Sequence, residues 1–79
     1  MPTLVVLATC KIQLYAGDHA PPHFKIHGPG TNANVAIETL QVLAGRADRK
    51  ALREARAWAS RPENRARLRR EWDRLNACG

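Results

Sequence analysis

Three side chains capable of acid–base chemistry alternate along one short stretch of the sequence, His23, Lys25 and His27. In an extended strand, residues two apart project from the same face, so a strand here turns Phe24 and Ile26 to the opposite face. Two histidines can serve as general base and general acid, while a lysine stabilises the charge that develops on a phosphate. The pattern is therefore compatible with metal-independent cleavage of RNA by His23, Lys25 and His27.

A metal site is a second kind of chemistry for this region, because His19, His23 and His27 are spaced four residues apart. Neutral imidazoles bind zinc or nickel, and three of them leave one coordination position open for water. Two features count against the site: the spacing crosses a turn and a strand, and Lys25 would place a positive charge beside the ion. We therefore rank it below the ribonuclease hypothesis, and we expect no cofactor.

The third interpretation of the segment is structural. Two consecutive prolines hold the preceding residue extended and fix a corner in the chain. Histidines at such a corner can hydrogen-bond to backbone groups, and the phenylalanine that follows would enter the core. The residues of this turn are Asp18, His19, Pro21, Pro22, His23 and Phe24. The structural role fits the residues best, so enzymatic activity is not our leading expectation.

Strands must position these side chains, and residues 1–45 favour strands and turns. Alternation and β-branched content predict strands over residues 3–7, 11–16, 23–27 and 34–38, with a short further strand at 41–43. The run 28–32, Gly-Pro-Gly-Thr-Asn, predicts a turn. Because the strands are close in sequence and joined by short turns, we expect antiparallel pairing.

Residues 46–79 favour two helices. Asp48 is a suitable N-cap for a helix over residues 49–59, and Ser60 with Glu63 matches a capping box for a second helix over residues 61–75. Apolar residues recur at helical spacing in both. They are Ala51, Leu52, Ala55, Trp58 and Ala59 in the first helix and Leu68, Trp72 and Leu75 in the second.

These elements predict an α+β fold. A two-helix hairpin packed on one face of a small antiparallel sheet of three to five strands buries both apolar stripes. Seventy-nine residues suffice for one hydrophobic core, so we expect a single domain over residues 1–79. In this arrangement Trp58 and Trp72 anchor the core.

The net charge of +6 arises entirely from residues 46–79, which hold eleven basic side chains against five acidic ones. Ten of the eleven are arginine, whose guanidinium group suits bidentate contacts with carboxylate or phosphate. Ion pairs between helical neighbours can neutralise only part of this excess. The arginines expected on the solvent side of the helices are Arg53, Arg56, Arg67, Arg70 and Arg74. They predict a surface for an acidic protein or nucleic acid.

Cysteine usage and hydropathy suggest where the protein works. Cys10 and Cys78 form neither a C-x-x-C pair nor a metal-ligand spacing, which fits a reducing compartment. We expect Cys10 to be buried and Cys78 to be a terminal thiol, a bridge between them being the alternative. No run of about 18 apolar residues is present, so we expect a cytoplasmic protein that binds no membrane.

An exposed sheet edge is compatible with a dimer.

The stretch Asp18-His19-Ala20-Pro21-Pro22-His23-Phe24 resembles the hallmark of a family of short bacterial proteins called domain of unknown function 4160. The opening Met1-Pro2-Thr3, the stretch Val42-Leu43-Ala44-Gly45 and the tryptophans Trp58 and Trp72 resemble the family too. The resemblance covers nearly the whole chain. It implies strands followed by helices and no established activity, and members are suspected of belonging to two-gene modules of toxin–antitoxin or regulatory type.

The chain departs from the family pattern at Lys25, where the family typically has a second histidine. A role that needs an imidazole at that position is therefore not carried over. Our leading hypothesis is a small interaction module of toxin–antitoxin or regulatory type that binds an acidic protein or nucleic acid through its basic helices. A ribonuclease is the alternative, and a metal-binding domain is third.

Overall fold

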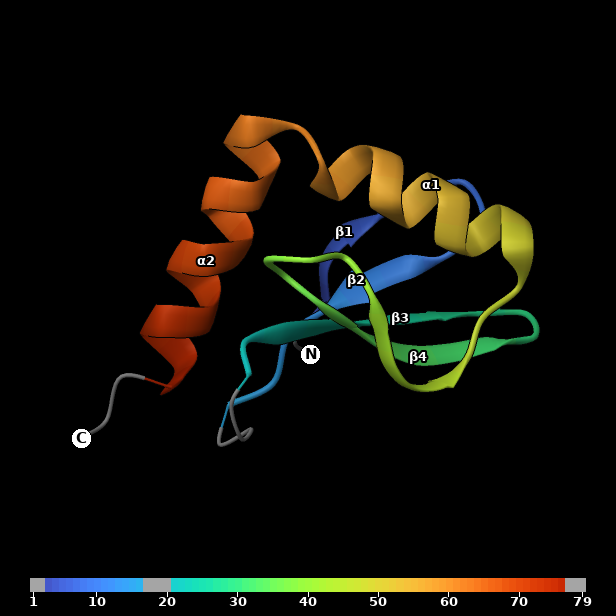
Figure 1. Cartoon of the computed structure of the whole chain (residues 1–79), viewed down its shortest axis with the longest axis horizontal. Helices are drawn as coiled ribbons and strands as arrows, with labels where there is room; N and C mark the ends of the chain where they lie inside the picture. Colours follow the sequence, from blue (N-terminus) through green and yellow to red (C-terminus); the bar gives the residue numbers. More distant parts are fainter. Residues whose placement is uncertain (1–2, 17–20, 77–79) are drawn as a thin grey trace.

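Each strand of the sheet pairs antiparallel with its neighbour in the chain. The computed structural model of the protein describes residues 3–16 and 21–76. Within them the strands come first and the helices follow, which confirms the predicted α+β fold (Figure 1). The elements are β1 (Thr3–Val6), β2 (Lys11–Gln13), β3 (His23–Gly28), β4 (Thr31–Ala36), β5 (Val42–Arg46), α1 (Arg49–Ala59) and α2 (Pro62–Asn76).

The turn between β3 and β4 is tighter than the sequence pattern predicted. Gly28 already pairs with Thr31, so only Pro29 and Gly30 connect the strands. Proline fixes a negative φ at the first of these positions, and Gly30 adopts a φ of 65° at the second, which suits a tight turn. The predicted strand over residues 34–38 therefore begins three residues earlier, at Thr31.

The core lies between one face of the sheet and the two helices. Alternate strand residues point into it and are almost fully buried, as are three alanines of α1 and two large side chains of α2. These residues are Ile12, Phe24, Ile26, Ala33 and Val35 from the sheet, with Ala51, Ala55, Ala59, Leu68 and Trp72 from the helices. The alanines let the backbone of α1 lie close to the sheet, while Trp58 is only half-buried against this core.

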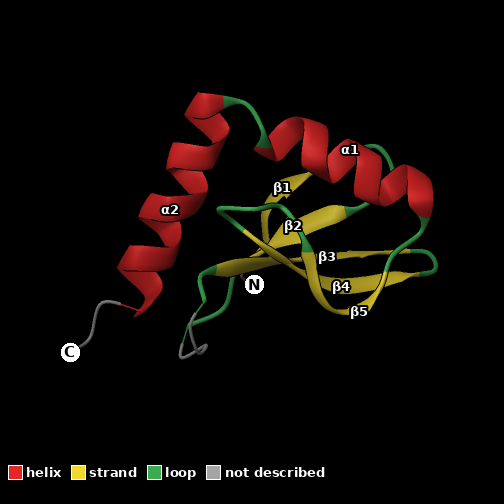
Figure 2. Cartoon of the chain, in the orientation of Figure 1, coloured by secondary structure: helices red, strands yellow, loops and turns green. Residues whose placement is uncertain are grey.

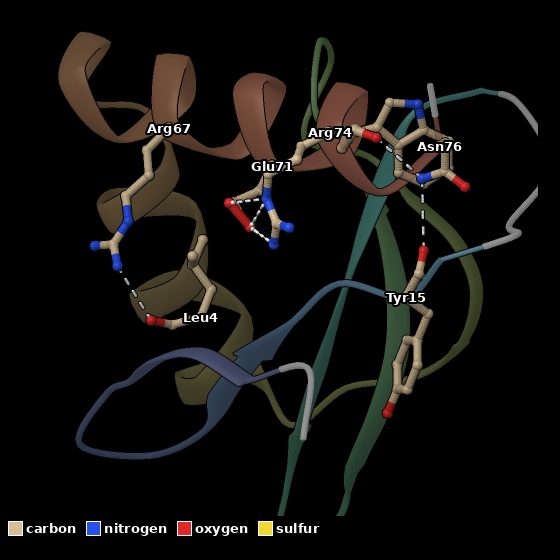
Figure 3. Close-up of polar contacts among 7 residues, drawn as sticks. Leu4, Tyr15, Arg67, Glu71, Arg74 and Asn76 are labelled. Carbon is tan, nitrogen blue, oxygen red and sulfur yellow. Dashed lines mark hydrogen bonds and ion pairs between the residues drawn. The ribbon is translucent and has the colours of Figure 1, made fainter. Parts of the chain in front are cut away.

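The two helices meet at a corner, so that α1 lies over the sheet and α2 runs past one end of it (Figure 2). Contacts from the middle and the C-terminal end of α2 hold it there. Arg67 donates from Nη2 to the carbonyl of Leu4 at 3.3 Å, and Asn76 donates from Nδ2 to the carbonyl of Tyr15 at 3.5 Å (Figure 3). The sheet end that meets α2 thus includes the start of β1 and the residues that follow β2.

The first helix begins as predicted, whereas the capping box predicted for the second was wrong. Asp48 has extended backbone angles and accepts from the backbone N–H of Lys50 at 3.1 Å. Ser60, in contrast, is helical and ends α1: its N–H bonds to the carbonyl of Arg56, and its hydroxyl donates to that of Ala57. Ser60 cannot cap both helices because closing the end of α1 fixes it in the helical region.

A close backbone approach explains the glycine of the Val42-Leu43-Ala44-Gly45 stretch. Gly45 has a φ of 90°, and a Cβ added there would overlap the carbonyl oxygen of Asn32 on the neighbouring strand. Gly30 also has a positive φ, but a Cβ added at that position meets no atom within 4 Å. The two glycines therefore share a backbone requirement and differ in steric space.

We predict that Gly45→Ala destabilises the protein more than Gly30→Ala does. The second substitution should cost about 1–2 kcal/mol, because only the left-handed backbone conformation is penalised. Gly45→Ala adds a collision with the carbonyl oxygen of Asn32, which moves β5 away from β4. Urea unfolding followed by circular dichroism measures both free energies, and equal losses would contradict the steric role of Gly45.

Candidate functional site

The proline corner is tied to the rest of the fold by backbone contacts. The carbonyl of Pro22 accepts from the N–H of Ile37 at 3.1 Å. Nδ1 of His23 lies 2.8 Å from the carbonyl oxygen of Pro21, a contact that requires the proton on Nδ1. Phe24 is fully buried, as predicted. The described part of the motif thus acts in folding, while Asp18 and His19 lie outside the described residues.

His23 also connects the sheet to the second helix. Its ring centroid lies 5.0 Å from that of Trp72, with the two ring planes at 53°. Such tilted ring contacts add to the gain from burial. Trp72 is 7% exposed, so this contact seals the core at the end of the sheet where α2 passes.

The three predicted catalytic residues share one strand face but do not converge. Strand geometry separates the Cα atoms of His23 and His27 by about 13 Å. His23 is turned toward Pro21 and Trp72, whereas His27 is exposed at the far end of β3. The arrangement therefore does not bring both imidazoles to one phosphodiester, as acid–base cleavage requires.

The metal hypothesis finds no support among the residues that the structure describes. Within residues 3–16 and 21–76, no three His, Cys, Asp or Glu side chains lie together so that they could hold a metal ion. Of the three candidate ligands, His23 and His27 are separated as described, and His19 lies outside these ranges.

The strand register brings further polar residues beside His27, on the sheet face that points away from the core. Lys11 of β2 lies opposite His27 on one side, and Asn32 of β4 lies opposite it on the other. Arg46 of β5 continues the row beyond Asn32. All four side chains are exposed. Sequence reasoning missed this row because only the pairing register aligns residues from four separate strands.

A second row of side chains runs parallel to the first, and more of its side chains are held by contacts within the protein. Lys25 lies between Gln13 of β2 and Asn34 of β4. Gln13 donates to the hydroxyl of Thr3 at 3.3 Å and accepts from the hydroxyl of Tyr15 at 3.1 Å. The Lys25 ammonium lies 5.5 Å from the centre of the Tyr15 ring, within the range of a cation–π contact.

We call the surface made by these two rows the open sheet face. Its residues are Lys11, Gln13, Tyr15, Lys25, His27, Asn32, Asn34 and Arg46. Among the described residues of the rows it has three permanent cations and no carboxylate. It therefore presents positive charge beside amide, imidazole and phenol groups.

Three of the five arginines predicted to bind a partner are engaged within the molecule. Arg56 donates from Nε to the carbonyl of Leu40 at 2.8 Å, and Arg67 contacts the carbonyl of Leu4 as described above. Arg74 forms an ion pair with a carboxylate one turn earlier in α2 (Figure 3). These three side chains fasten the helices, and so they are less available to a partner.

Other helical cations remain exposed. Within residues 3–16 and 21–76, the side chains of six cations, five in the helices and Arg61 between them, make no hydrogen bond or ion pair, and two of the six belong to the predicted set. We call them the outer helical cations, and they are Arg49, Lys50, Arg53, Arg61, Arg65 and Arg70.

The carboxylates of the second half are largely engaged. A hydrogen bond from Arg74 holds the pKa of Glu71 below its ordinary value, and Glu71 in turn raises the pKa of Arg74. Arg69 contacts Glu38 at 2.8 Å and Asp73 at 3.8 Å. These acids therefore pair directly with Arg69 and Arg74, while the outer helical cations form no direct ion pair with them.

Glu54 has a structural role that sequence reasoning missed. Instead of pairing with Lys50 along α1, its carboxylate accepts from the hydroxyl and N–H of Thr9 and from the N–H of Ala8 at 3.0 Å. The hydroxyl bond is the largest cause that lowers the pKa of Glu54. The carboxylate thus fixes the β1–β2 connection to α1.

Cys10 lies beneath this connection. It is 5% exposed, which confirms its predicted burial, and its Sγ lies 3.7 Å from the carbonyl oxygen of Ala51. Burial is the main cause that raises the pKa of the thiol, with the nearby Glu54 carboxylate adding to it. The thiol is therefore protonated and unreactive at neutral pH. Cys78 lies outside the described residues.

The fold and motif agree with the comparison to protein families. The chain matches the family described as domain of unknown function (DUF4160) over residues 10–73. It belongs to this family, as the resemblance in sequence indicated. No curated protein and no solved structure matches the chain. Neither helix that the structure describes has the length and apolar character needed to cross a membrane.

We predict that Glu54→Gln lowers the melting temperature at neutral pH, because the neutral amide accepts hydrogen bonds less strongly than the carboxylate. Since folding depresses the pKa of Glu54, the ionised group stabilises the protein above its unfolded pKa. This stabilisation is lost as the pH falls through the folded pKa. The difference in melting temperature between the variant and the unsubstituted protein should therefore shrink below a pH of about 4.

Thermal unfolding followed from a pH of about 3 to about 8 measures the difference in melting temperature between the Glu54→Gln variant and the unsubstituted protein. Glu63→Gln is the matched control, since the Glu63 side chain is exposed and makes no hydrogen bond or ion pair within the described chain. A Glu54 variant that behaves as the Glu63 variant at every pH would contradict the role of the carboxylate.

Proposed function

We propose that the protein is a small interaction module of toxin–antitoxin or regulatory type that binds an acidic protein through its outer helical cations. The observation that carries the proposal is the uncompensated charge of the helices. The side chains of six exposed cations there make no hydrogen bond or ion pair with any described residue, while Glu71 and Asp73 pair with other arginines. Such an excess of positive charge attracts a partner of opposite charge and speeds its association.

The distribution of the cations favours a protein over a nucleic acid at this surface. A nucleic-acid backbone is best followed by a continuous row of cations. Along α2 the predicted row is interrupted, because Arg67 and Arg74 are drawn into internal contacts and only Arg70 remains. An acidic protein can place separate carboxylates against Arg49 and Arg53 on α1 and against Arg70 on α2, each in the bidentate geometry that arginine favours.

Triple charge reversal of these residues, Arg49→Glu, Arg53→Glu and Arg70→Glu, tests the proposal. The tagged protein is used to capture partners from an extract of its own cells at physiological salt, and the captured species are identified. We expect one small acidic protein in stoichiometric amount, and we expect the triple variant to lose it, because three attractions become repulsions.

The matched control is Lys11→Glu, Lys25→Glu and Arg46→Glu on the open sheet face. Both triple variants lower the formal net charge from +6 to zero, so they differ only in where the charge is removed. The control should keep the partner. Capture of nucleic acid without protein, or equal loss of the partner from both variants, would overturn the assignment of this surface to an acidic protein.

A further inference from the structure

The open sheet face is a second surface whose chemistry the helical proposal does not use. The buried strand residues and α1 lie on the other side of the sheet, and α2 runs past one end of it. We propose that this face binds single-stranded RNA. The inference is independent of the proposed function, because it concerns residues of the strands instead of the helices and a different class of partner.

The spacing of its cations suits an extended chain of phosphates. The first row crosses β2, β3, β4 and β5, with Lys11 at one end and Arg46 at the other. Neighbouring strands lie about 4.8 Å apart, so these two cations are separated by about 14 Å. Lys25 lies in the next row, two residues along β3 from His27. The three cations therefore surround the centre of the face instead of gathering at one point.

The polar groups between the cations are the types that contact bases and sugars. The side-chain amides of Asn32 and Asn34 make no hydrogen bond within the described chain, so they can donate to and accept from a ligand. His27 is exposed, and Tyr15 is 38% exposed. Both rings can stack on unpaired bases, and base–aromatic stacking contributes about 1–3 kcal/mol per base.

Part of this surface is held in place before any ligand arrives. Gln13 bonds to Thr3 and Tyr15, and Lys25 is held near the Tyr15 ring. Hydrogen-bonded side chains on a paired sheet lose little further freedom on binding, which lowers the entropic cost of complex formation. Gln13 of β2, Lys25 of β3 and Tyr15, which follows β2, supply this ordered part of the face.

A single strand of RNA fits this face better than a duplex. A broad sheet cannot enter a groove, but it can accept splayed bases on its surface while cations contact the backbone. The 2′-hydroxyl of RNA both donates and accepts hydrogen bonds, and amides beside the cations can use both capacities. Asn32 and Asn34 are placed for this between Lys25 and Arg46.

Binding of a fluorescent single-stranded RNA oligonucleotide to the purified full chain, followed by anisotropy as the salt concentration is varied, tests the proposal. The triple variant Lys11→Glu, Lys25→Glu and Arg46→Glu should bind at least about tenfold more weakly. Removing three phosphate contacts should also reduce the slope of log affinity against log salt by about 2.

The variant Arg49→Glu, Arg53→Glu and Arg70→Glu is the control for net charge, and it should keep the affinity and the salt slope. Equal loss of RNA binding in both variants, or none in the sheet variant, would overturn the proposal. So would DNA or duplex RNA of the same sequence that binds as tightly as the single-stranded RNA. Loss of the acidic protein in the helical variant, with RNA binding kept, would separate the two surfaces.

A milder variant guards against misfolding, since charge reversal at three neighbouring strands could disturb the sheet. Lys11→Gln, Lys25→Gln and Arg46→Gln removes the positive charges without adding negative ones. It should fold with an unchanged circular dichroism spectrum and show the same reduction in salt slope. A folded glutamine variant that retains the full slope would contradict the assignment of these cations to phosphates.

Discussion

The burial of one sheet face beneath the helices is the constraint on which the other features depend. Ile12, Phe24 and Ile26 are fully buried there, and the alanines of α1 allow the helix backbone to approach them closely. Because side chains alternate along a strand, placing these residues inward forces their neighbours outward. Lys11, Lys25 and His27 therefore share the opposite face as a direct consequence of core formation.

The corner motif extends this constraint to the second helix. Pro22 is held by the backbone of Ile37, and His23 reaches both Pro21 and the ring of Trp72. The residues that looked most like catalytic groups in sequence thus include one that fastens α2 to the sheet. His23, the first residue of β3, follows directly after the proline corner and makes the ring contact with Trp72. These contacts give the motif a folding role that requires neither catalysis nor metal binding.

The charges of the molecule are divided between those that hold it together and those that remain outside. Arg56, Arg67 and Arg74 bond within the protein, and Glu54 fastens the β1–β2 connection. What is left is positive charge on two separate surfaces, the outer helical cations and the open sheet face. Two surfaces that differ in their polar neighbours can serve different partners, which is why we assign them to different classes of ligand.

Local patterns in the sequence were enough to determine the elements and the inward residues. Asp48 caps α1 and the helix covers residues 49–59 as predicted, because capping and helical spacing act over a few residues. Sequence also identified the strand face of Lys25 and His27. Strand ends were less accurate, since tight turns such as the one at Gly30 depend on pairing between neighbours.

Only the tertiary structure decided which distant groups meet. The register places Lys11, His27, Asn32 and Arg46 in one row, although they come from four strands. Packing directs Glu54 to the backbone of Thr9 instead of to a lysine on its own helix. These pairings depend on how elements far apart in the chain are brought together, and the period of a single strand or helix carries no information about them.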